Sequence, residues 1–331
     1  MPAIKKKDGG VTLIELMIVL FIAAFLVAGI YSLFITQHRS YAVQDQVVGV
    51  QQDARVALDL MARDIRMAGY VAGAGSGTGF TDGTISSITI PSNPTGDTYR
   101  FAVEPRNFTT TPDTLTVVLG VEVLGEVLSV NGTTITVTDD HINPKDVDYY
   151  FKDSNGNPIN GKYYIAFDLQ SGRLYRVNTV DDTNITITNY PSGTTKTIGG
   201  KTYGVQAITY SVGADGVLRR NTNTSATSNQ PLAGDGINTI VEDLQFAYQV
   251  SGDAGWYNAP ANFPAGKTAA DIRMIRINIT VRPAVQDAVV QDAATTAQFN
   301  QPALEDHTTN LNGPDGFRRR VYTTEVRVRN L

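Results

Sequence analysis

The sequence has no cysteine, one tryptophan and three histidines among its 331 residues. Without cysteine, disulfide bonds and thiolate metal sites are excluded. The histidines, His38, His141 and His307, stand far apart and form no H-E-x-x-H pair, so the pattern of a zinc site is missing. Acidic residues outnumber basic ones by 32 to 27, and this balance gives no expectation of nucleic-acid binding.

Charge is also missing from one long stretch, because no charged residue lies between Glu15 and Arg39. Residues 16–35 contain neither charge nor proline, and as a helix they would rise about 30 Å, the thickness of a bilayer core. Three lysines at 5–7 predict a single pass with the N-terminus inside. A carboxylate in hydrocarbon costs about 2.5–3.5 kcal/mol, so Glu15 is predicted to be a functional residue.

Three kinds of signal fit an apolar segment near the N-terminus. The run is longer than the apolar part of a secretory signal peptide, and no A-x-A site follows it. A plain signal anchor remains an alternative. The third kind is cut before its apolar segment, and Gly10-Val11-Thr12-Leu13-Ile14-Glu15 resembles the prepilin peptidase site of type IV pilins and type II secretion pseudopilins.

This resemblance implies a leader over residues 1–10, cleavage between Gly10 and Val11, and N-methylation of the new Val11 amine. It also implies an assembly role for Glu15. A free α-amine has a pKa of about 8, and two opposite charges buried together cost less than either alone. We therefore expect the Val11 amine of one subunit to contact Glu15 of its neighbour. The sequence departs from the family at Val11, where Phe is more frequent, and at Asp8, an acid in a basic leader.

A helical pattern continues beyond the apolar segment. From Val43 to Ala68 apolar residues recur every three or four positions, which predicts one helix from about Thr12 to Ala68 with Gly69 as its stop. Residues 11–35 are predicted to form the membrane or filament-core part, and residues 36–69 an amphipathic continuation that packs on a folded domain. A coiled-coil dimer is the alternative for the second part.

The rest of the chain reads as β-structure after a Gly-rich connector at residues 70–84. We expect a variable β-rich region at 85–204 and a C-terminal β-rich region at 205–331. Loops are predicted at 221–236 and 251–270. A long segment outside the strands is predicted at 284–316, with one short helix near 286–297. The fold class predicted is α+β, a long N-terminal helix packed on an antiparallel β-rich domain. Strands are predicted at 85–90, 98–103, 114–119, 125–130, 133–138, 163–168, 173–180, 184–190, 205–212, 217–220, 240–250, 272–282 and 320–328.

Several short patches resemble PilW-like minor type IV pilins, in the order of that family. They are RDIRMAGY at 63–70, ITY at 208–210 with GVLRR at 216–220, VEDLQFAY at 241–248, IRINITV at 275–281 and VYTTEVRVRN at 321–330.

The resemblance implies a minor pilin at the pilus tip that primes assembly and supports adhesion or twitching. The partners implied are prepilin peptidase, an inner-membrane assembly platform, and other minor and major pilins. The localisation implied is the inner membrane before assembly and the extracellular pilus afterwards. Two alternatives remain, a J-type minor pseudopilin of type II secretion and an adhesin that binds a ligand through residues 85–204.

Other chemistry has little support in the sequence. There is no G-x-S-x-G, and the P-loop-like spacing at 156–162 is followed by Tyr163 in place of Ser or Thr, so neither an enzyme nor a cofactor is expected. Asp153, Asn155 and Asn157 form a weak calcium candidate that lacks the EF-hand glycine and final acid. The arginines at 318–320, 327 and 329 are interpreted as a solvated strand, with a subunit contact as the alternative.

Overall fold

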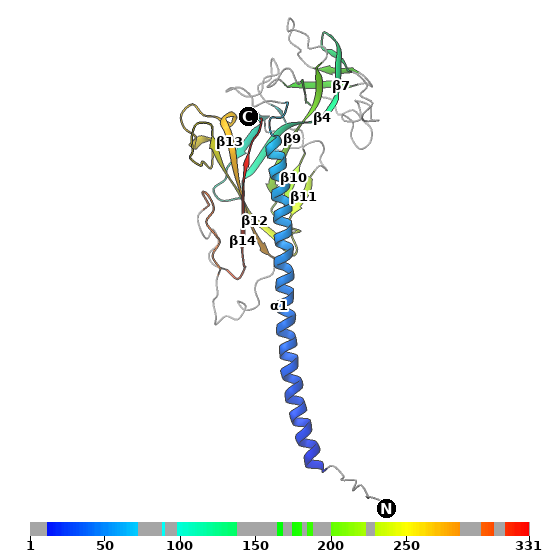
Figure 1. Cartoon of the computed structure of the whole chain (residues 1–331), viewed down its shortest axis with the longest axis vertical. Coiled ribbons are helices and arrows are strands. Elements are labelled where there is room, and N and C mark those ends of the chain that lie inside the picture. Colours follow the sequence, from blue (N-terminus) through cyan, green and yellow to red (C-terminus); the bar gives the residue numbers. More distant parts are fainter. Residues whose placement is uncertain are drawn as a thin grey trace, which may run out of the picture. The chain divides into compact units, whose positions relative to one another are not determined.

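Figure 1 shows the structure, a computed structural model. It describes residues 12–71, 88–89, 98–137, 164–167, 174–180, 184–187, 200–222, 229–284, 299–307 and 315–330. The chain divides into two compact units, residues 1–49 and 50–331, and each is treated by itself.

Helix α1 runs from Leu13 to Met67, 55 residues without a proline. It ends at Gly69, whose φ of 75° lies in the left-handed region that glycine adopts without strain. The Gly69 N–H donates to the carbonyl oxygen of Val118 at 2.8 Å, and this bond ties the helix end to a strand. The predicted helix and its stop are therefore confirmed.

The C-terminal part of α1 buries one face in the second unit. Each buried residue lies three or four positions from another, so together they form one face of the helix. They are Ala54, Ala57, Leu58, Met61, Ala62, Ile65 and Ala68. Arg55, Asp59 and Arg63 on the other face are exposed. The apolar stripe thus packs against strands of its own chain, and the seam that a coiled-coil dimer would use is already filled.

Strands from two sheets enclose this helical stripe in one core. One sheet has the order β12-β13-β14 and is antiparallel, with bounds Thr239–Val250, Ile272–Pro283 and Arg320–Arg327. Its core face carries Ile275, Ile277, Ile279 and Val326, all 0% exposed. Two short 3-10 helices, Pro260–Asn262 and Ala269–Asp271, lie in the β12–β13 connection.

The other sheet has nine strands in the order β11-β10-β9-β6-β7-β8-β5-β4-β3, and β9 also pairs with β4. Its longest strand, β4, continues through Gly125 without a break where two separate strands are predicted. The strands are β3 (Val103–Arg106), β4 (Thr114–Asn131), β5 (Thr134–Val137), β6 (Tyr164–Phe167), β7 (Tyr175–Val180), β8 (Asn184–Ile187), β9 (Lys201–Val212), β10 (Leu218–Asn221) and β11 (Asn229–Ala233).

The β9–β4 pairing closes six of these strands into a ring. The pairs β4–β5, β5–β8, β8–β7, β7–β6, β6–β9 and β9–β4 are all antiparallel. A separate hydrophobic core fills the ring, and the long strands β4 and β9 connect it to the strands beside α1 (Figure 1). This core consists of Leu124, Val127, Val130, Ile135, Val137, Ile165, Tyr175, Val177, Ile185 and Ile187. We call this six-stranded ring the barrel module.

The structure differs from the sequence-based expectation in two ways. Described strands of the variable region close into a barrel, whereas the sequence predicted only β-structure there, and closure removes the exposed edges that an open sheet would have. Strand β11 lies inside the predicted loop at 221–236. A further short pair, β1 (Ile88–Thr89) and β2 (Thr98–Tyr99), forms the two-stranded sheet. The predicted helix near 286–297 lies outside the described residues.

Candidate functional site

The N-terminal end of α1 brings Thr12 and Glu15 together. The Thr12 N–H and hydroxyl donate to Oε2 of Glu15 at 3.4 and 3.3 Å, and the Glu15 N–H donates to Oγ1 of Thr12 at 3.3 Å. These reciprocal bonds form a capping box, which satisfies N–H groups that the first helical turn leaves free. Thr12 was not predicted as a partner of Glu15, although the spacing T-x-x-E is visible in the sequence.

Residues Leu13–His38 of α1 are long and apolar enough to cross a membrane. An 18-residue window of this segment has a mean hydropathy of 2.8, and none of that window is buried. The 26 residues rise about 39 Å, more than the roughly 30 Å of a bilayer core. Large side chains such as Phe21 and Phe25 are about three-quarters exposed. Within the described part of the chain, this apolar surface has no protein cover.

The predicted cleavage pair, Gly10 and Val11, lies outside the described residues, as do the calcium candidates Asp153, Asn155 and Asn157. Cleavage, methylation and calcium binding therefore stay predictions from the sequence. Among the residues that the structure does describe, no three His, Asp or Glu side chains are grouped so that they could hold a metal ion.

A buried charge anchors the other end of α1 to the sheet. Asp64, 7% exposed, accepts hydrogen bonds at Oδ2 from the Tyr210 hydroxyl at 2.5 Å and from Nε of Arg220 at 2.7 Å. Burial, together with the Asp64 carboxylate, raises the pKa of Tyr210, so the phenol keeps the proton that it donates. These three residues come from three separate patches of the PilW resemblance, which the fold joins at one point.

A second buried cluster surrounds His307. Its Nδ1 lies 2.8 Å from Oδ2 of Asp243, and its Nε2 lies 2.9 Å from the carbonyl oxygen of Phe108. Two acceptors on the two ring nitrogens favour the doubly protonated imidazolium. Burial alone would lower the pKa of His307, but the bond and charge of Asp243 raise it above its usual value. The cluster joins β12 to the segments at 107–113 and 299–307.

Asp113 faces the same cluster from the segment before β4. It is 1% exposed and accepts N–H bonds from Phe108 at 2.8 Å and Phe246 at 3.1 Å. Burial raises the pKa of Asp113 to about 7 in spite of these bonds, and the charge of Asp306 acts in the same direction. The cluster therefore contains two groups with raised pKa values, Asp113 at about 7 and His307 above its usual value.

The arginine run divides into different roles, which the interpretation as a solvated strand did not anticipate. The Arg319 side chain is only 5% exposed and forms ion pairs with Glu242 and Asp315, both at 2.5 Å. Arg282 pairs with Glu242 at 3.2 Å and stacks on Phe317. Arg319 thus holds β14 against β12. Glu242 lies 77 positions away from Arg319, and Asp315, four positions before it, is not in a helix, so the helical i,i+4 rule could not reveal this network.

Comparison with known families gives two matches. Residues 5–31 match the Prokaryotic N-terminal methylation motif, and residues 202–330 match the family Type IV Pilus-assembly protein W. The chain therefore carries a type IV prepilin signal and a PilW domain, and the resemblance predicted from the sequence is confirmed. Both families are those of structural pilins. No curated protein matches the chain.

Among solved structures, a type IV-like pilin from Thermus thermophilus is similar to this chain, with 12% sequence identity and a TM-score of 0.39. The similarity covers 85% of this chain and 97% of that one. A likeness at this level does not extend to function.

The His307 cluster predicts a pH-dependent stability. The unfolded-state pKa of His is about 6.5, and the folded-state value is higher, so its contribution is full below about pH 6.5 and disappears as pH rises through the folded value. The raised pKa of Asp113 acts in the same direction, because stability falls as pH rises from about 4, the unfolded-state pKa, to about 7, the folded-state pKa. We expect His307→Gln to cost about 3–5 kcal/mol at pH 6, and less as pH rises.

The measurement is thermal unfolding of the full chain in detergent between pH 5 and 9, with His38→Gln as the matched control. His38 is exposed and its ring meets the edge of the Phe34 ring, so its replacement should leave the profile unchanged. A loss for His307→Gln that stays constant from pH 6 to 9 would contradict the role assigned to the imidazolium.

Proposed function

We propose that this chain is a minor pilin of a type IV pilus, incorporated at the pilus tip, where it primes assembly and supports adhesion or twitching. The observation that carries this proposal is the combination of a methylation motif at 5–31 with a PilW region at 202–330 on one chain. The uncovered apolar helix supports it, because such a surface requires either lipid or other helices around it.

In this proposal the chain first spans the inner membrane once, with its lysine-rich leader inside. Prepilin peptidase cuts between Gly10 and Val11, and the new amine is methylated. The assembly platform then moves the helix from lipid into a bundle of pilin helices. No residue acts as a catalyst, and no cofactor is needed, because the work is insertion, docking and display.

The Glu15 carboxylate gives this docking its register. The capping box orients the carboxylate but leaves its negative charge, which still requires a cation in an apolar bundle. The Val11 amine of a neighbouring subunit supplies that cation. A J-type pseudopilin of type II secretion would share this step, and the genes beside this one, for pilus tip or for secretion, distinguish the two systems.

Mass spectrometry of sheared pili tests processing and incorporation together. We expect a peptide that begins at N-methylated Val11 and no peptide from residues 1–10, because the leader stays in the cell. Pili that lack this chain, or a chain that retains Met1, would contradict the proposal.

Two substitutions separate the charge of Glu15 from its cap. Glu15→Gln keeps a side chain that suits a capping box but removes the charge, whereas Thr12→Val removes the cap and keeps the charge. We expect Glu15→Gln to lower incorporation into pili at least about tenfold, which corresponds to about 1.4 kcal/mol. Thr12→Val should stay near the wild-type level, since a lost cap costs about 1 kcal/mol of helix stability.

Incorporation is measured by immunoblot of sheared pili, and membrane fractions show whether insertion is intact. If Glu15→Gln assembles normally while Thr12→Val does not, the carboxylate acts through the cap, and the intermolecular contact is wrong.

The barrel module favours a second function, adhesion through residues 85–204. The module has a hydrophobic core of its own, separate from the core around α1, so it can change without affecting the helix–sheet packing. A closed barrel needs no neighbouring strand to complete it, and this suits a part that is displayed to ligands.

A deletion at paired positions tests this second function. Residues 122 and 204 face each other across β4 and β9, so replacing 123–203 by Asn-Gly leaves a hairpin with a two-residue turn. We expect this variant to enter pili at wild-type levels and to lose attachment of the cells to surfaces. Unchanged attachment would contradict an adhesive role for the module, and loss of the variant from pili would show that the module serves assembly.

A further inference from the structure

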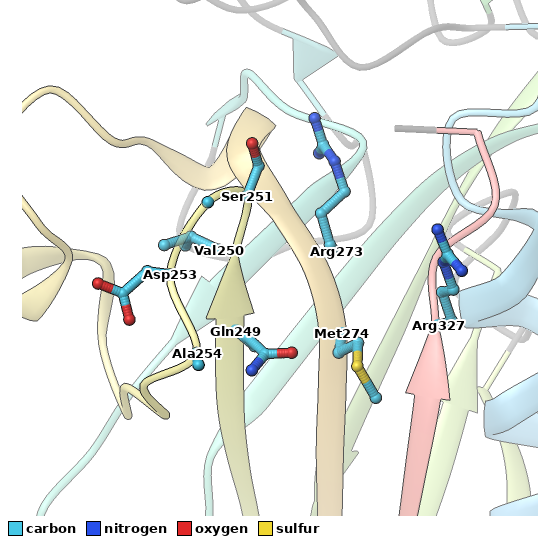
Figure 2. A pocket seen from close by; sticks show the side chains of 9 residues that line it. Gln249, Val250, Ser251, Asp253, Ala254, Arg273, Met274 and Arg327 are labelled. Carbon is cyan, nitrogen blue, oxygen red and sulfur yellow. The ribbon is translucent and has the colours of Figure 1, made fainter.

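A cavity of about 490 Å³ lies at one end of the three-stranded sheet, where β12 ends, β13 begins and β14 ends. Its walls include Arg273, Met274 and Arg327 on the strands and the turn at 251–254 that follows β12 (Figure 2). We call it the strand-end pocket. No step of the proposed function uses it.

The two arginines of the strand-end pocket differ in how they are held. One terminal nitrogen of Arg273, Nη1, donates to the carbonyl oxygens of Ala270 and Ile272 at 2.9 and 3.0 Å. Its Nε and other terminal nitrogen remain as donors. Arg327 is exposed and pairs with Met274 through the strand backbone, but its guanidinium forms no hydrogen bond or ion pair with any residue that the structure describes. The pocket therefore offers one fixed and one adaptable guanidinium.

The nearby carboxylates are engaged elsewhere. Asp253 also lines the pocket, but its Oδ1 accepts the Gly255 N–H at 2.6 Å, and its carboxylate points away from both arginines (Figure 2). Asp271 pairs with Lys267 at 3.2 Å and caps its own 3-10 helix. The charge of Asp271 also acts on Arg273, whereas Arg327 forms no ion pair with a described carboxylate.

The end of β14 is held in place before any ligand arrives. The Val328 N–H donates to the carbonyl oxygen of Arg273 at 2.9 Å, and the Arg329 N–H and the Asn330 amide reach carbonyl oxygens at the end of α1 at 3.4 to 3.5 Å. Arg327 therefore projects from a fixed backbone, which lowers the entropy cost of binding.

We propose that the strand-end pocket binds an acidic peptide segment of a neighbouring pilus subunit. A carboxylate is the group that two guanidinium forks recognise best, and the Ser251 hydroxyl and Gln249 amide add neutral hydrogen-bonding groups. Met274 supplies an apolar wall for the stem of an aspartate or glutamate side chain. These neutral and apolar groups beside the arginines favour a peptide over a small free anion. This inference rests on the proposed function, because that function supplies the neighbour.

The test places a photo-crosslinking amino acid at Gln249 in the full chain, in cells that make pili. We expect a crosslink to another pilus subunit, and mass spectrometry should place it beside an aspartate or glutamate of that subunit. Arg327→Glu should lower the yield about tenfold or more, because it sets like charges against each other. Arg320→Glu is the matched control, the same change at the exposed opposite end of β14.

A charge swap completes the test. Changing the crosslinked acid of the partner to lysine should restore the yield with Arg327→Glu. If Arg320→Glu and Arg327→Glu act alike, or if the crosslinked peptide lacks an acid, or if the only crosslink is to lipid, the pocket proposal is wrong. Incorporation of the unsubstituted chain into pili is measured separately. If the pocket proposal fails while the chain still enters pili, the proposed function stands.

Discussion

The uncovered apolar surface between Leu13 and His38 is the constraint on which the rest of the structure depends. Every large apolar side chain that is exposed here gains by leaving water, and no described part of the chain covers it. Such a helix is stable only in lipid or against other apolar helices. The folded unit of residues 50–331 therefore uses only the second part of the helix for its core.

The domain holds the helix by two means that act on the same stretch. Small and medium apolar residues from Ala54 to Ala68 let strands of two sheets approach closely, and Asp64 adds a directed contact in the middle of this face. The apolar contacts give most of the free energy, whereas the Asp64 bonds to Tyr210 and Arg220 fix the rotation of the helix. A helix rotated about its axis would bury the carboxylate without partners, at a cost of several kcal/mol.

The sequence predicted what depends on local periodicity. The ends of α1, its buried stripe and most strands follow from spacing of three or four, from alternation and from Gly69. Contacts between residues far apart in the sequence could not be predicted, because the sequence does not show which aspartate is buried and which is exposed. Asp64 and Asp59 lie on the same predicted helix, yet only Asp64 is buried among strands. Closure of the barrel module could not be predicted either, because the β9–β4 pairing joins strands about 80 residues apart. Thr12, in contrast, could have been found from T-x-x-E.

The capping box changes how Glu15 is understood. A carboxylate in the first helical turn is favoured by the helix dipole and by the N–H groups that it accepts, so Glu15 is not simply a charge placed at a cost in an apolar segment. The cap also restrains Thr12, the residue that follows the predicted cleavage pair. Local capping and the proposed intermolecular pairing are therefore compatible, because the cap orients the carboxylate that the proposed pairing would use.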